Sequence, residues 1–158
     1  MTSPNPLPAT QDVAALFRDL LGVAAGADRV KPPLSADEAF RAYYLKGEDT
    51  PFGAMLLDRE LAVRASAALA MLPPGGLAER LQAGEVDGEM RDHLAEVANV
   101  CSGLFPSKAF RVRLAGLFAP REAAPEAWAA VLASPAHRVD FSLSLGAYGG
   151  GRLAVCAG

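Results

Sequence analysis

The stretch that says most about this chain is DHLAEVANVCSGLF, residues 92–105. Its polar residues Asp92, Glu96 and Asn99 and the following Gly103 stand at spacings of four, three and four. Each residue of an α-helix advances by about 100°, so these four positions share one narrow stripe. The pattern therefore predicts an amphipathic helix whose wet face holds a carboxylate and a carboxamide one turn apart. The apolar side of this helix carries Met90, Leu94, Val97, Ala98, Cys101, Leu104 and Phe105.

The composition is that of one globular domain with a mild negative charge. The chain has 158 residues, of which 51% are hydrophobic and 21% charged, and this length is enough to bury a core. The net charge is −3 and the pI is near 5.4. Because no basic patch with interleaved aromatic residues is present, nucleic acid is not an expected partner.

The N-terminal segment and the apolar runs of the chain indicate where in the cell we expect the protein. Residues 1–10 contain three prolines and no apolar period, so we expect a disordered tail followed by a single domain at 11–158. The start lacks the basic and apolar segments of a signal peptide. The best apolar run, residues 61–72, is broken by Arg64, so no membrane span is predicted. We therefore expect a cytoplasmic protein with Cys101 and Cys156 reduced.

Hydrophobic periodicity and turn residues predict a mixed set of helices and strands. Strands rarely alternate singly with helices, which favours an α+β two-layer domain with helices on one face of a largely antiparallel sheet. We expect Thr10, Asp58 and Asp87 to cap helices, and residues 28–35 to form a loop or an edge. The expected helices are 11–23, 59–72, 88–105 and 124–132, with further turns at 77–83, and the expected strands are 40–45, 52–57, 110–115, 140–145 and 153–156.

Many solvent-exposed helix faces carry two acidic residues and an amide at this spacing, so Asp92, Glu96 and Asn99 alone do not indicate a function. The full pattern D-x3-E-x2-N-x3-G on an amphipathic helix, however, resembles the motif of the CheC/CheX/FliY family of chemotaxis phosphatases. Residues 52–72 resemble the strand and helix that precede the motif helix in that family. Residues 16–22 resemble its early helix, and residues 144–155 its closing hairpin.

The chain also departs from that family in two places. CheC-like members carry two copies of the motif, but the first helix here offers only Asp12, Leu16 and Asp19 at the matching spacing. One site is therefore expected, as in CheX-like members. Pro120 and Pro125 flank the place where family members often carry a proline, so the loop after the strand is expected to differ.

The resemblance implies hydrolysis of the aspartyl phosphate on a response-regulator receiver domain such as CheY. It implies that Asn99 orients the attacking water and that Glu96 docks against the receiver's lysine. Asp92 would extend the docking face, and Gly103 would let the partner approach closely. The receiver supplies the Mg²⁺, so no cofactor of the protein's own is expected. CheX-like relatives pair sheet edges in dimers, and the C-terminal hairpin gives this chain an edge to offer, so a homodimer is expected.

Other chemical sites receive little support from the residues. A metal site from Asp92, His93 and Glu96 lacks a further ligand, and His93 lies about 60° around the helix from Glu96. Cys101 falls on the apolar side with no base beside it. The glycines at 146–151 stand between two strands without a following helix, which favours a hairpin turn over a phosphate loop.

Two other functions stay open at this level. One is a non-catalytic module of the same fold that binds a receiver or resembles a motor-switch protein. The other is a small-molecule binding domain, which would need a pocket that the sequence does not display.

Overall fold

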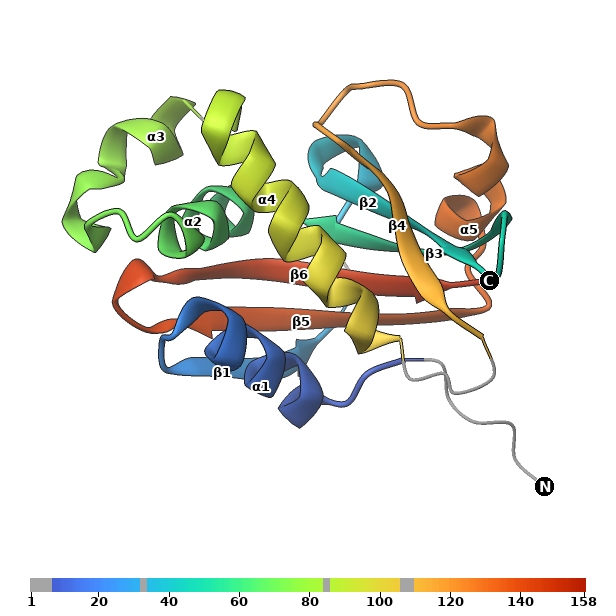
Figure 1. Cartoon of the computed structure of the whole chain (residues 1–158), viewed down its shortest axis with the longest axis horizontal. Helices are drawn as coiled ribbons and strands as arrows, with labels where there is room; N and C mark the ends of the chain where they lie inside the picture. Colours follow the sequence, from blue (N-terminus) through green and yellow to red (C-terminus); the bar gives the residue numbers. More distant parts are fainter. Residues whose placement is uncertain (1–6, 32–33, 84–85, 106–109) are drawn as a thin grey trace.

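A computed structural model describes residues 7–31, 34–83, 86–105 and 110–158. Its described part contains an open six-stranded antiparallel sheet in the order β1-β5-β6-β3-β2-β4, with helices packed against it (Figure 1). The helices are α1 (Thr10–Leu21), α2 (Arg59–Leu69), α3 (Ala78–Ala83), α4 (Gly88–Val100) and α5 (Ala129–Ala133). The strands are β1 (Ala25–Val30), β2 (Phe40–Lys46), β3 (Thr50–Leu57), β4 (Val112–Phe118), β5 (His137–Leu145) and β6 (Gly150–Ala157).

The main core lies between the sheet and the layer formed by α1, α2 and α4. Alternation along β3 divides its side chains between two faces, with Met55 and Leu57 on the helical side and Ala54 and Leu56 on the other. Figure 1 shows α4 running diagonally across the front of the sheet, between α2 and β4. The predicted α+β two-layer fold is confirmed.

The back face of the sheet is covered in part by a short segment that includes α5. A 3₁₀ turn, Glu126–Trp128, leads into α5, and Trp128 packs beside Tyr43 with ring centroids 5.4 Å apart. Val131 and the buried Cys156 belong to the same small apolar cluster. The expected helix at 124–132 thus exists, but its first turn is 3₁₀ and it lies opposite the other helices.

Most predicted elements form within a few residues of the expected bounds, and two differ. The strand β1 is an edge strand, as one of the two expectations for residues 28–35 had it, but it begins earlier, at Ala25, and pairs with β5 from Ala25↔Leu145 to Val30↔Asp140. The first helix begins at Thr10, so Ala9 and not Thr10 is its N-cap residue, and the Ala9 N–H donates to Asp12. Residues 1–6 of the predicted tail lie outside the described part of the chain.

The C-terminal hairpin is confirmed, but it lies in the middle of the sheet. The strand β6 pairs with both β5 and β3, so neither hairpin strand is an edge. The expectation that this hairpin offers an edge for dimerisation is therefore wrong, and β1 and β4 are the edge strands of the described sheet. Within β6, Gly151 allows the start of α2 to approach, because a Cβ there would stand 2.6 Å from Asp58 Oδ1.

Asp58 explains why α2 starts at this point. Its carboxylate accepts hydrogen bonds from the backbone N–H groups of Leu61, at 2.8 Å, and Arg152, at 3.0 Å. The predicted cap therefore also links α2 to the hairpin. In the described part of the structure, no helix has the length and apolar character that crossing a membrane requires.

Candidate functional site

The motif lies on α4, as the sequence predicts. The helix follows Asp87, whose backbone is extended, and it buries Met90, Leu94, Val97 and Ala98. At Cys101 the α-helix changes to a 3₁₀ turn, Cys101–Leu104, whose Cys101 and Leu104 are also buried. Because these apolar side chains pack against the sheet, the opposite face of α4 is exposed to solvent.

All four predicted site residues are exposed on the outer side of this segment. Asp92, Glu96 and Asn99 are exposed on α4, and Gly103 is exposed in the 3₁₀ turn. The side chains of Glu96 and Asn99 make no hydrogen bond or ion pair with any residue that the structure describes. Glu89, also exposed, falls on the same stripe two turns before Glu96. The face therefore presents three carboxylates and one carboxamide to a partner.

Two contacts from the sheet side hold α4 in place. The guanidinium of Arg91 donates to the Glu122 carboxylate, at 2.8 Å, and to the Leu117 carbonyl, at 2.9 Å. Near the other end of the helix, the Tyr44 hydroxyl donates to the Ala98 carbonyl at 2.6 Å. Sequence reasoning missed both contacts, because their partners stand 31 and 54 positions apart without a shared motif.

Electrostatics around Arg91 follows from that ion pair. The hydrogen bond from Arg91 lowers the pKa of Glu122, and the same bond raises the pKa of Arg91. Glu122 stands between Pro120 and Pro125 in the loop after β4. Through Glu122, the loop after β4 contacts the motif helix.

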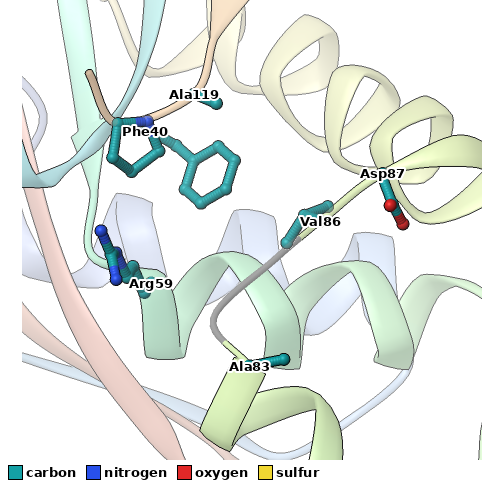
Figure 2. A pocket seen from close by; sticks show the side chains of 7 residues that line it. Phe40, Arg59, Ala83, Val86, Asp87 and Ala119 are labelled. Carbon is teal, nitrogen blue, oxygen red and sulfur yellow. The ribbon is translucent and has the colours of Figure 1, made fainter. Parts of the chain in front are cut away.

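Two of the cavities in the described structure lie near the start of α4. One of about 450 Å³ opens where α2 and α4 begin, near the start of β2. Figure 2 shows Phe40 and Arg59 on one side of it and Val86 on the other. A second, of about 350 Å³, includes His93 and Arg80. Since Glu96 and Asn99 are exposed and line neither cavity, the candidate site is an open surface that suits a macromolecular partner.

The described residues do not form a metal site or an activated cysteine nucleophile. No group of three or more His, Cys, Asp or Glu side chains is placed to hold a metal ion. Cys101 and Cys156 are free and buried, and burial raises the pKa of Cys156 to about 11 and that of Cys101 further. Both thiols are therefore protonated and poor nucleophiles at neutral pH. Asp12, from the incomplete second motif, is engaged in capping α1.

Comparison with solved structures places this architecture among known folds. CheX of Borrelia burgdorferi, solved with CheY, BeF3 and magnesium, superposes with a TM-score of 0.54, covering 94% of each chain at 13% identity. The chain has a CheX-like fold. FliM of H. pylori, solved with SpeE, gives a TM-score of 0.55 over 94% of this chain and 80% of FliM at 6% identity. FliY of Thermotoga maritima gives 0.50 over 95% of this chain and 84% of FliY at 12% identity.

No family model and no curated protein matches the sequence of this chain. The likeness to CheX, FliY and FliM is therefore one of fold. At the level of fold, the resemblance inferred from residues 92–105 is confirmed.

Proposed function

We propose that this protein is a phosphatase of the CheX type, which hydrolyses the aspartyl phosphate of a CheY-like receiver domain. The observation that carries the proposal is the pair Glu96 and Asn99, exposed on one helix face and without a hydrogen-bond or ion-pair partner in the part of the chain that the structure describes. The fold supports it, because a CheX of the same architecture has been solved with CheY, BeF3 and magnesium.

An acyl phosphate is already reactive, and the receiver brings its own Mg²⁺ and lysine, so the protein needs no cofactor of its own. What it adds is an oriented water. Phosphoryl transfer passes through a loose transition state, in which positioning and charge placement provide most of the acceleration. The Asn99 carboxamide can donate and accept at once, so it can hold a water in line with the phosphorus.

The carboxylates of the face have a docking role. Glu96 would pair with the receiver's lysine, and Asp92 would extend the negative surface toward the start of α4. Gly103 is open on its outer side, since a Cβ there would meet no atom within 4 Å. A receiver could therefore approach the backbone of this turn closely.

The alternative is a non-catalytic module that binds a receiver or acts like a motor-switch protein. The observation in its favour is the equally good superposition on FliM, at a TM-score of 0.55. The two functions differ in one measurable property, which is turnover. Both place the protein in the cytoplasm with its partner.

The experiment mixes the protein with CheY-like receivers charged by acetyl phosphate and follows phosphate release. Acceleration that disappears in both Glu96→Ala and Asn99→Ala supports the phosphatase. Binding to a BeF3-charged receiver without acceleration supports the alternative. No binding and no acceleration across a panel of receivers would remove both.

A homodimer is part of the proposal, with the edge strands β1 or β4 as the pairing surface in place of the hairpin. The outer strand β1 carries Asp28 and Arg29, both exposed, and β4 carries the exposed Arg113. Light scattering coupled to size-exclusion chromatography measures the mass directly, and a monomer mass would remove this part.

A further inference from the structure

Tyr44 reaches from β2, the strand next to the edge strand β4, to the backbone beneath the motif. It lies on β2, is fully buried, and stacks at a tilt on Phe105, with ring centroids 5.0 Å apart. Its hydroxyl donates to the Ala98 carbonyl at 2.6 Å. Ala98 is the residue immediately before Asn99, so this bond ends on the peptide unit that carries Asn99.

The sheet around Tyr44 is shaped for this contact. The pairing of β2 shifts register next to Tyr44 on both sides, against β3 and against β4, and such bulges re-aim side chains. Opposite Tyr44 in β3 stands Gly53, where a Cβ would lie 2.8 Å from the Phe105 ring. The backbone carbonyl of Tyr44 accepts a hydrogen bond from Trp128 Nε1 at 3.2 Å, which holds it from the back face.

The Ala98 carbonyl lies near the C-terminal end of α4, where the helix has the fewest hydrogen bonds of its own. The last carbonyls of an α-helix lack intrahelical donors, and α4 ends two residues after Ala98, where the 3₁₀ turn begins. The bond from Tyr44 therefore fixes a helix end that would otherwise rely on apolar packing. Burial raises the pKa of Tyr44 well above its ordinary value, so the hydroxyl keeps its proton at working pH.

We infer that Tyr44 is a positioning residue for Asn99, holding the end of α4 so that the carboxamide holds the attacking water in line with the phosphorus. This rests on the proposed phosphatase function. The Asn99 side chain has no hydrogen-bond partner among the described residues, so its place depends on the backbone that carries it. A misplacement of about 1 Å at a reacting group can cost on the order of 100-fold in rate.

The test compares Tyr44→Phe with Tyr43→Phe. Tyr43 is the adjacent residue, equally buried, but it faces Trp128 on the back of the sheet, and its hydroxyl interacts with Arg41 and makes no hydrogen bond to the described residues of α4. Each substitution removes one oxygen and leaves the ring. We expect Tyr44→Phe to lower kcat for receiver dephosphorylation by roughly tenfold, with KM within about twofold of wild type. Tyr43→Phe should leave both unchanged.

Circular dichroism at the assay temperature establishes that both variants are folded. A second readout is the Asn99 side-chain amide resonance in a ¹H–¹⁵N spectrum, which we expect to shift in Tyr44→Phe and not in Tyr43→Phe. Equal kcat values for the two variants, or an unmoved Asn99 resonance, would overturn the inference. A wild-type protein that releases no phosphate would instead overturn the proposed function, and the spectrum would still decide whether Tyr44 fixes Asn99.

Discussion

Arg91 on α4 and Glu122 after β4 form an ion pair with a nitrogen–oxygen distance of 2.8 Å. Arg91 also donates to the Leu117 carbonyl at the end of β4. From the back of the sheet, the buried Arg41 donates to the carbonyls of Ala119 and Glu122. The loop after β4 is thus held by an arginine from each face, and through Arg91 it is joined to the helix that carries the motif.

Substitution of Arg91 should destabilise the protein more than substitution of Glu122. We expect Arg91→Ala to lower the free energy of unfolding by about 1–2 kcal/mol, because it loses the ion pair and the bond to Leu117. Glu122→Gln should cost only about 0.5 kcal/mol, because Arg91 keeps the backbone acceptor and the carboxamide oxygen. Urea denaturation measures both values. Equal losses would contradict the geometry.

The same pair makes stability depend on pH. Arg91 lowers the pKa of Glu122 in the folded protein, so the unfolded chain binds a proton at a higher pH than the folded one. The contribution of the pair is therefore complete above about pH 4.3, the ordinary value for glutamate. It is lost as the pH falls through the lower pKa of the folded state. Urea denaturation measures the difference in the free energy of unfolding between wild type and Glu122→Gln. We expect this difference to shrink at low pH, and a difference that grows as the pH falls would contradict the prediction.

A substitution at Gly103 should affect receiver binding without affecting stability. A Cβ at Gly103 would meet no atom within 4 Å, so Gly103→Ala should leave the melting temperature unchanged or slightly raised. If Gly103 lies under the partner, the added methyl group should weaken binding of a BeF3-charged receiver several-fold. The matched control is Gly75→Ala, at an equally open glycine in the 3₁₀ turn after α2. Titration calorimetry that gives the same Kd for both variants would remove Gly103 from the docking face.

The sequence predicts the motif helix and its exposed face because helical spacing converts directly into sidedness. Asp92, Glu96 and Asn99 stand on one stripe whatever surrounds them, and the buried Leu94 and Val97 turn that stripe outward. Asp58 marks a helix start because capping is local chemistry, whereas Asp87 occupies the N-cap position of α4 but, contrary to the prediction, its side chain makes no capping hydrogen bond. The layer arrangement follows from the order of helices and strands.

What the sequence does not reveal depends on pairing across distance. The strand β1 has the sequence AGADRV, and only Ala25 in it is buried, so its pattern carries no clear period of two. The place of the C-terminal hairpin inside the sheet depends on β6 pairing with β3, which no local signal encodes. For the same reason, Arg91–Glu122 and Tyr44–Ala98 become visible only when the chain is folded.

The central claim is that Asn99 holds a water for attack on a partner's acyl phosphate. Single-turnover decay of a ³²P-labelled CheY-like receiver, measured at saturating protein, tests it most directly. We predict that Asn99→Ala lowers the saturating rate by on the order of 100-fold, while Kd for the BeF3-charged receiver stays within about threefold of wild type. A saturating rate for Asn99→Ala equal to that of wild type would contradict the account.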